Sequence, residues 1–169
     1  MAAAVTELLL VRHAIAFERD SARWRDDRDR PLSPRGIARA RRAAQGLSRL
    51  SRPPLRVLVS PLLRTRQTAR VLSEVAGWPQ AEACAQLQPG RSPAQLLGLL
   101  AGLRETRIAA IGHEPDLGRL LQACLGAATS KPFEFRKMGV ALVTFRGPVR
   151  AGAGSLACFL PPRVLRAAR

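Results

Sequence analysis

Short apolar runs alternate with amphipathic stretches along most of the chain. The runs over 5–12, 55–59 and 107–112 are rich in Val, Leu, Ile and Ala, as in strands that are buried on both faces of a parallel sheet. A weaker run at 81–85 predicts another strand, and 140–145 and 155–160 predict a terminal hairpin. Between these runs, apolar residues spaced three and four apart predict helices over 33–50, 62–77, 92–103 and 115–126.

This order of elements predicts one α/β domain over residues 1–169. Alternating strands and helices favour a three-layer α/β/α arrangement with a mainly parallel central sheet, which the hairpin makes mixed. Ser33, Ser60 and Ser92 each precede a proline and are predicted helix N-caps. Residues 14–31 are dense in charge and lack periodicity, so we expect a loop with at most a short helical turn, rimming the first strand's carboxyl end. We expect the tail 161–169 to be partly disordered.

Charge and composition exclude several classes of protein. The net charge of +16 comes from 28 basic and 12 acidic residues, and it attracts polyanions. The excess is almost all arginine spread along the chain, and tyrosine is absent, so nucleic acid is disfavoured as a partner.

No apolar run approaches the roughly 20 residues of a membrane span, and no secretory signal is evident, so we expect a cytoplasmic protein. Three widely spaced cysteines predict neither a disulfide nor a zinc site.

Similar chemical groups follow three of the predicted strands. Arg12 and His13 end the first strand, Arg64 lies early in the helix after the second, and His113 follows the strand over 107–112. Carboxyl ends of parallel strands share one edge of a sheet, so these groups can converge there. Arginines and helix amino termini favour an anion such as a phosphoryl group. A metal site is disfavoured, because a third histidine is lacking and the arginines would repel a cation.

The motifs around these residues are similar to those of a known family. The chain resembles the histidine phosphatase superfamily, also called phosphoglycerate-mutase-like, and within it the short SixA-type phosphohistidine phosphatases. The matching segments, in family order over about two-thirds of the chain, are 10–14 (LVRHA), 30–36 (RPLSPRG), 57–69 (VLVSPLLRTRQTA) and 111–115 (IGHEP). The Arg-His pair alone is weak evidence. The Ser-Pro-x-x-Arg-x-x-Gln-Thr-Ala block is much stronger, and His113 completes the set.

The resemblance implies a histidine phosphatase fold without a cap insertion, and catalysis without a metal or organic cofactor. His13 would be the nucleophile, and Arg12, Arg64 and His113 would hold the phosphoryl oxygens. Arg30 matches a further arginine near the phosphate pocket in short members, with a solvated loop charge as the alternative. The implied partner is a phosphorylated protein carrying phosphohistidine, or a small phosphate ester, and we expect a monomer.

Two departures from the family pattern bear on mechanism. Ala14 stands where glycine usually follows the nucleophile, and the segment 86–90 has no carboxylate where larger relatives have a glutamate general acid. Asp27 or Glu114 could donate the proton instead. Asp27 is alternatively a loop salt bridge, and Glu114 alternatively contributes only a backbone N–H to the phosphate.

Two rival functions remain open beside phosphohistidine hydrolysis. The first is a small-molecule phosphomonoesterase of the same superfamily. The second is a catalytically idle protein that binds phosphate or nucleic acid, which the intact set of two arginines and two histidines argues against.

Overall fold

A computed structural model of the chain describes residues 4–127 and 133–168. The core of the fold is a six-stranded sheet in the order β3-β2-β4-β1-β5-β6. Its strands are β1 (Val5–Arg12), β2 (Arg56–Val59), β3 (Glu82–Ala83), β4 (Arg107–Gly112), β5 (Val140–Arg146) and β6 (Gly154–Leu160). The first four run parallel, and β5 and β6 run antiparallel to their neighbours. The predicted mixed, mainly parallel α/β sheet is confirmed.

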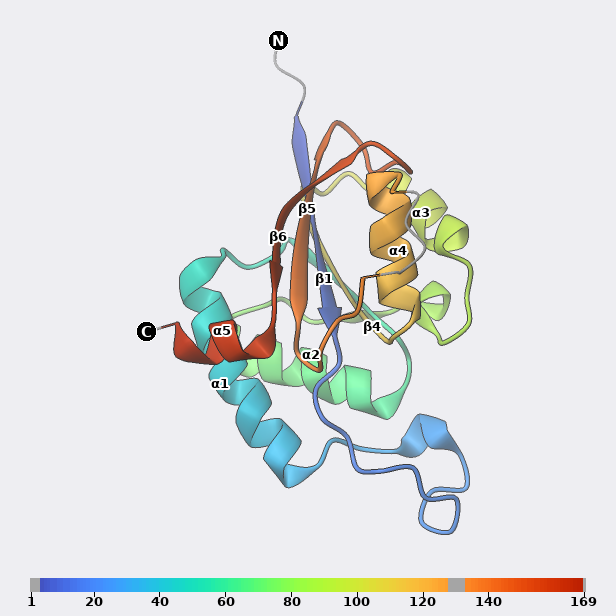
Figure 1. Ribbon diagram of the computed structural model, residues 1–169, viewed down its shortest axis with the longest axis vertical. Helices are drawn as coiled ribbons and strands as arrows, with labels where there is room; N and C mark the ends of the chain where they lie inside the picture. The colour runs from blue at the N-terminus through green and yellow to red at the C-terminus, as the bar shows by residue number, and fades with distance from the viewer. Residues whose placement is uncertain (1–3, 128–132, 169) are drawn as a thin grey trace.

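Helices cover both faces of this sheet (Figure 1). They are α1 (Pro34–Leu50), α2 (Leu63–Ala76), α3 (Pro93–Ala101), α4 (Asp116–Leu125) and α5 (Pro162–Ala167), with short 3₁₀ turns η1 (Asp27–Asp29) and η2 (Ala85–Leu87). Alternate residues of β1 point to opposite faces, as the pleat requires. Leu9 packs in the cluster that includes α1 and α2, and Leu8 in the cluster that includes α3 and α4. The four longer helices begin and end close to their predicted bounds.

The expectation of a partly disordered tail was wrong for Pro162–Ala167, which forms α5. This short helix packs against α1, and the Leu165 side chain is fully buried between them. The two backbones come so close that a Cβ atom added to Gly46 would lie 1.7 Å from the Leu165 carbonyl oxygen. Glycine at this point of α1 therefore makes room for the docking of α5.

Two of the three predicted serine caps are found. Ser33 accepts a hydrogen bond from the Gly36 N–H at the start of α1, and Ser92 accepts one from the Ala94 N–H at the start of α3. The prediction for Ser60 was wrong, because α2 begins only at Leu63 and has no side-chain cap. The hydroxyl of Ser60 is used elsewhere, at the carboxyl edge of the sheet.

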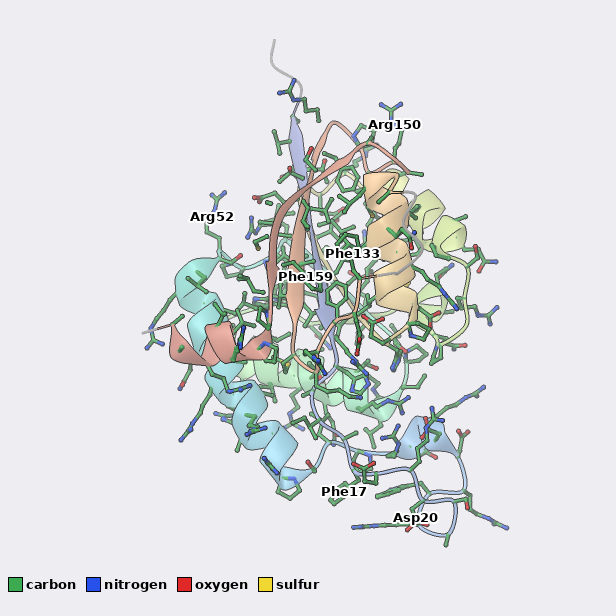
Figure 2. The ribbon with its side chains drawn as sticks, in the orientation of Figure 1. Phe17, Asp20, Arg52, Phe133, Arg150 and Phe159 are labelled. Carbon is green, nitrogen blue, oxygen red and sulfur yellow. The ribbon has the colours of Figure 1, made fainter. Side chains whose placement is uncertain are left out.

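The charge-rich loop leaves the carboxyl end of β1 and contains only the single turn η1, as predicted. In Figure 2, Phe17 and Asp20 mark this loop where it extends beyond the ends of the strands. None of the helices in the described ranges is both long enough and apolar enough to cross a bilayer.

Candidate active site

Strands β1 and β4 bring the two histidines of the chain together. The strands pair in register up to Arg12 and Gly112, so the residues that follow, His13 and His113, leave the sheet side by side. The His13 N–H donates to the Gly112 carbonyl at 3.1 Å, and the centroids of the two imidazole rings are 5.1 Å apart. The convergence predicted from the strand ends is therefore present in the structure.

An open cavity of about 400 Å³ lies at this edge of the sheet. Its lining is mostly basic and consists of Arg12, His13, Glu18, Arg19, Arg30, Arg64, Pro89, His113, Glu114 and Lys137. A hollow of similar size, about 430 Å³, lies along α2 and is lined by Arg66, Arg70 and Ser73 among others, without a histidine. Chemistry rather than volume therefore distinguishes the cavity at the strand ends.

The hydrogen bonding of His13 defines which nitrogen can react. Its Nδ1 lies 2.7 Å from the Ala14 carbonyl oxygen, which can only accept, so Nδ1 carries the proton. The lone pair is then on Nε2. Burial, followed by the charges of Lys137 and His113, lowers the pKa of His13 to about 2, so the ring is neutral at physiological pH. This is the protonation state that a nucleophilic imidazole requires.

Ser60 has a role here that the sequence did not suggest. Its fully buried hydroxyl lies 2.9 Å from His113 Nε2. Burial, followed by the charges of Arg64 and Lys137, lowers the pKa of His113 to about 3. A neutral His113 whose Nε2 accepts from the Ser60 hydroxyl carries its proton on Nδ1. It can then donate that proton in a hydrogen bond to an oxyanion.

Both arginines of the predicted set line the cavity, where Arg64 is buried and Arg12 is half-buried. Nη1 of Arg12 donates to the Phe135 carbonyl at 2.5 Å, and Nη1 of Arg64 donates to the Asp27 carbonyl at 2.7 Å. Burial lowers the pKa of each, yet guanidinium groups remain charged in proteins. The Nε atoms of Arg12 and Arg64 are buried and lack a hydrogen-bond partner among the described residues. These are two cationic donors available to an anion.

Arg30 and Asp27 form one ion-pair group with Arg64. Arg30 Nε lies 2.7 Å from Asp27 Oδ1, and Arg64 Nη2 lies 3.1 Å from Asp27 Oδ2. Arg30 is only 8% exposed, so the alternative of a solvated loop charge does not hold. Burial raises the pKa of Asp27, but the hydrogen bond from Arg30 and the charge of Arg64 outweigh it and lower the pKa. Asp27 is therefore an ionised counterion of the arginines, which fits the salt-bridge alternative.

Glu114 differs from Asp27 in its surroundings. Its side chain lines the cavity, is partly buried, and accepts a hydrogen bond from the Phe135 N–H at 2.8 Å through Oε1. Burial raises the pKa of this carboxyl group, against the lowering effects of that hydrogen bond and of Arg12. Of the two predicted proton donors, Glu114 has the environment that favours a protonated carboxyl group. Its backbone N–H as a phosphate ligand stays a prediction.

Ala14 does not need the conformational freedom of the glycine that it replaces. Among the non-glycine residues that the structure describes, only Met138 has a positive φ, at 66°. The buried Ala14 donates its N–H to Thr68 Oγ1 at 3.0 Å, and Thr68 donates in turn to the Arg64 carbonyl. The backbone after His13 is thus fixed by α2.

The sequence did not identify Lys137 as a member of the site. Its Nζ lies 3.4 Å from His13 Nε2 and lines the cavity, although 124 residues separate the two along the chain. One signal was available, because Lys137 is one of only two lysines in a chain with 28 basic residues.

The chain is similar to known proteins in both sequence and structure. The model of the histidine phosphatase superfamily (branch 1) matches residues 8–88. An uncharacterized protein of Picosynechococcus sp. (strain PCC 7002) is 34% identical over 137 residues, which are 79% of this chain and 82% of that protein.

Two solved structures are similar to the whole fold. The protein histidine phosphatase SixA in complex with tungstate has a TM-score of 0.82 and 26% identity, over 95% of this chain and 99% of that one. The putative phosphohistidine phosphatase SixA from Agrobacterium tumefaciens has a TM-score of 0.77 and 24% identity, over 93% and 98%. At 24% identity the likeness shows the fold alone.

Proposed function

This chain belongs to the histidine phosphatase superfamily (branch 1), and from that premise we propose that it hydrolyses phosphohistidine on a protein through a phosphorylated His13. The observation that carries the proposal is the neutral His13, with its Nδ1 proton bonded to a backbone carbonyl and its Nε2 lone pair on a cavity lined by arginines. An imidazole in this state is a ready nucleophile for phosphorus.

The first step of the proposed reaction transfers the phosphoryl group to the enzyme. His13 Nε2 attacks phosphorus, and the bond between phosphorus and the substrate imidazole breaks with its electron pair going to the substrate nitrogen. Arg12, Arg64 and His113 would hold the equatorial oxygens as negative charge develops. The phosphorylated His13 is an imidazolium that keeps its Nδ1 proton on the Ala14 carbonyl, which stabilises the intermediate.

The second step releases phosphate. Water attacks the phosphorus of the intermediate, and the electron pair of the P–Nε2 bond returns to His13. Both protons of the water leave with the inorganic phosphate as dihydrogen phosphate, and the ring returns to its neutral starting state. No proton has to be delivered to His13 in this step, because neutral imidazole is itself the leaving group.

The likeness to SixA supports a phosphohistidine as the substrate. The chain aligns over 95% of its length with a solved SixA, so little sequence is left for an insertion that would cover the cavity. An open cavity can admit a phosphorylated side chain on another protein. A phosphoramidate also needs less acid catalysis than an ester, since its imidazole leaving group can arrive protonated.

One observation favours a second candidate, a small-molecule phosphomonoesterase. Glu114 lines the cavity, and its burial raises its pKa. A protonated carboxyl group in this position could supply the proton that an alkoxide leaving group requires.

The test compares wild type with His13→Ala on a protein carrying phosphohistidine, and on p-nitrophenyl phosphate. We expect phosphohistidine turnover that is lost in the variant, with circular dichroism showing that both are folded. Arg64→Lys and Arg66→Lys provide a matched pair on α2, because only Arg64 lines the cavity. We expect a loss of activity in the first alone, since lysine lacks the bidentate fork. Cleavage of the ester alone would refute phosphohistidine as the substrate. Inactivity on both substrates would refute the proposal that the protein is an enzyme.

A further inference from the structure

The turn that carries Lys137 is bonded directly to the end of β1. The Met138 N–H donates to the Arg12 carbonyl at 3.1 Å, and the Arg12 N–H donates to the Gly139 carbonyl at 3.1 Å. Met138 has a φ of 66°, in the left-handed region of backbone conformation that residues other than glycine rarely adopt. Such strained positions persist where the surrounding structure holds them, often at functional sites. The backbone therefore fixes Lys137 beside the nucleophile.

The Lys137 ammonium is a partly buried cation among other cations. It lies 3.4 Å from His13 Nε2 and shares the cavity with Arg12, Arg30 and Arg64. Among the described residues, no carboxylate lies within ion-pairing distance of it. The side chain of Lys137 is half-buried, and the charge of Glu18 acts on it only from beyond ion-pairing distance. A cation held among other cations without an ion pair favours an anionic ligand.

The position of Nζ indicates which part of the reacting group it would meet. In a reactive complex phosphorus lies about 3 Å from the nucleophile, and its equatorial oxygens are at a similar distance. The leaving group lies on the far side of phosphorus. We propose that Lys137 is a further catalytic residue, whose ammonium donates a hydrogen bond to an equatorial oxygen of the phosphoryl group that His13 receives. This inference rests on the proposed function for the identity of the nucleophile.

The Lys137 ammonium can also donate a hydrogen bond to His13 itself. Because Nδ1 of His13 carries its proton, the lone pair on Nε2 can accept a hydrogen bond from the Lys137 ammonium. An incoming phosphoryl oxygen is a stronger acceptor, since it is charged. Binding of the anion thus moves the ammonium from nitrogen to oxygen and frees the lone pair for attack.

A lysine in this position should limit anion binding at alkaline pH. Burial, followed by the charges of Arg12, Arg30 and Arg64, lowers the pKa of Lys137 to about 8. The other ionisable groups that face the cavity are the guanidinium groups of its four arginines and the carboxyl groups of Glu18 and Glu114. His13 and His113, with pKa values of about 2 and 3, stay neutral throughout this range. Anion binding should therefore weaken as the pH rises through about 8.

The test measures binding of tungstate, a tetrahedral oxyanion, by calorimetry between about pH 7 and pH 10, on either side of the pKa of Lys137. The variants are Lys137→Met, Lys137→Arg and, as the matched control, Arg136→Met, which removes an exposed cation outside the cavity. At about pH 7, we expect Lys137→Met to bind at least about 10-fold more weakly than wild type, as expected for the loss of one charge-assisted hydrogen bond. We expect that variant to lose the pH dependence, and Lys137→Arg to retain binding at high pH. Arg136→Met should match wild type.

Equal tungstate affinity of Lys137→Met and wild type would overturn the inference, and so would a pH dependence that survives in the variant. The kcat/KM for phosphohistidine should fall in parallel, and an unchanged kcat/KM would likewise count against a catalytic role. A wild type that binds tungstate through Lys137 but cleaves no phosphoryl substrate would refute the proposed function while supporting Lys137 as an oxyanion ligand.

Discussion

Replacing Lys137 with methionine should make the unliganded protein more stable at neutral pH. Burial of the wild-type ammonium, followed by the charges of Arg12, Arg30 and Arg64, lowers the pKa of Lys137 and opposes its charged form. Methionine has a similar length and no charge. The same substitution that weakens anion binding should therefore increase the free energy of unfolding.

The size of the effect follows from the pKa of Lys137. Lowering it from 10.5 to about 8 would correspond to about 3 kcal/mol for a fully buried group. Solvent screening reduces this for a partly exposed side chain, so we expect about 1 to 2 kcal/mol, or about 2 to 8 °C in Tm. Between about pH 8 and pH 10.5 the unfolded state binds the extra proton, so wild-type stability rises with pH across that window. The advantage of the variant should vanish at its upper end.

Thermal and urea unfolding at about pH 7 and pH 10 would measure this, with Arg136→Met as the control. Saturating tungstate should reduce the advantage of the variant by about 1.4 kcal/mol or more, because it binds wild type at least about 10-fold more tightly. A Lys137→Met protein that is less stable than wild type at pH 7 would refute the reasoning. So would a stability difference that does not change between the two pH values.

Three other substitutions test separate features. Ser60→Ala should lower kcat/KM about 10-fold, because His113 loses the hydrogen bond that orients its ring; an unchanged kcat/KM would dismiss that role. Glu114→Gln should slow cleavage of p-nitrophenyl phosphate more than that of phosphohistidine, and equal effects would count against Glu114 as an acid for esters. Leu165→Ala should lower the free energy of unfolding by about 2 to 4 kcal/mol in urea, and a near-neutral result would mean that α5 contributes little.

The sequence predicts the sheet well because its signals are local and strong. The strands Val5–Arg12 and Arg107–Gly112 have the bounds expected from their apolar runs. The convergence of His13 and His113 follows from the rule that parallel strands end at one edge of the sheet, and it needs no detail of packing.

What the sequence missed depends on contacts between distant parts of the chain. Ser60 precedes a proline and has the local pattern of a helix cap, but its hydroxyl is used by His113. The helix α5 has six residues, too few to be stable alone, and forms because Leu165 packs on α1. Lys137 lies in an irregular stretch, so only the fold places it against His13.

The antiparallel direction of β5 determines when the site is completed during synthesis of the chain. Because β5 runs opposite to β1, its amino end reaches the edge where β1 ends, and it brings Phe135 and Lys137 to Arg12 and His13. A nascent chain that has emerged only as far as α4 would carry both histidines together with Arg12 and Arg64. It would lack the Phe135 carbonyl that holds Arg12 and the Lys137 ammonium beside His13. Full activity should thus appear on the ribosome only after β5 has been added to the sheet.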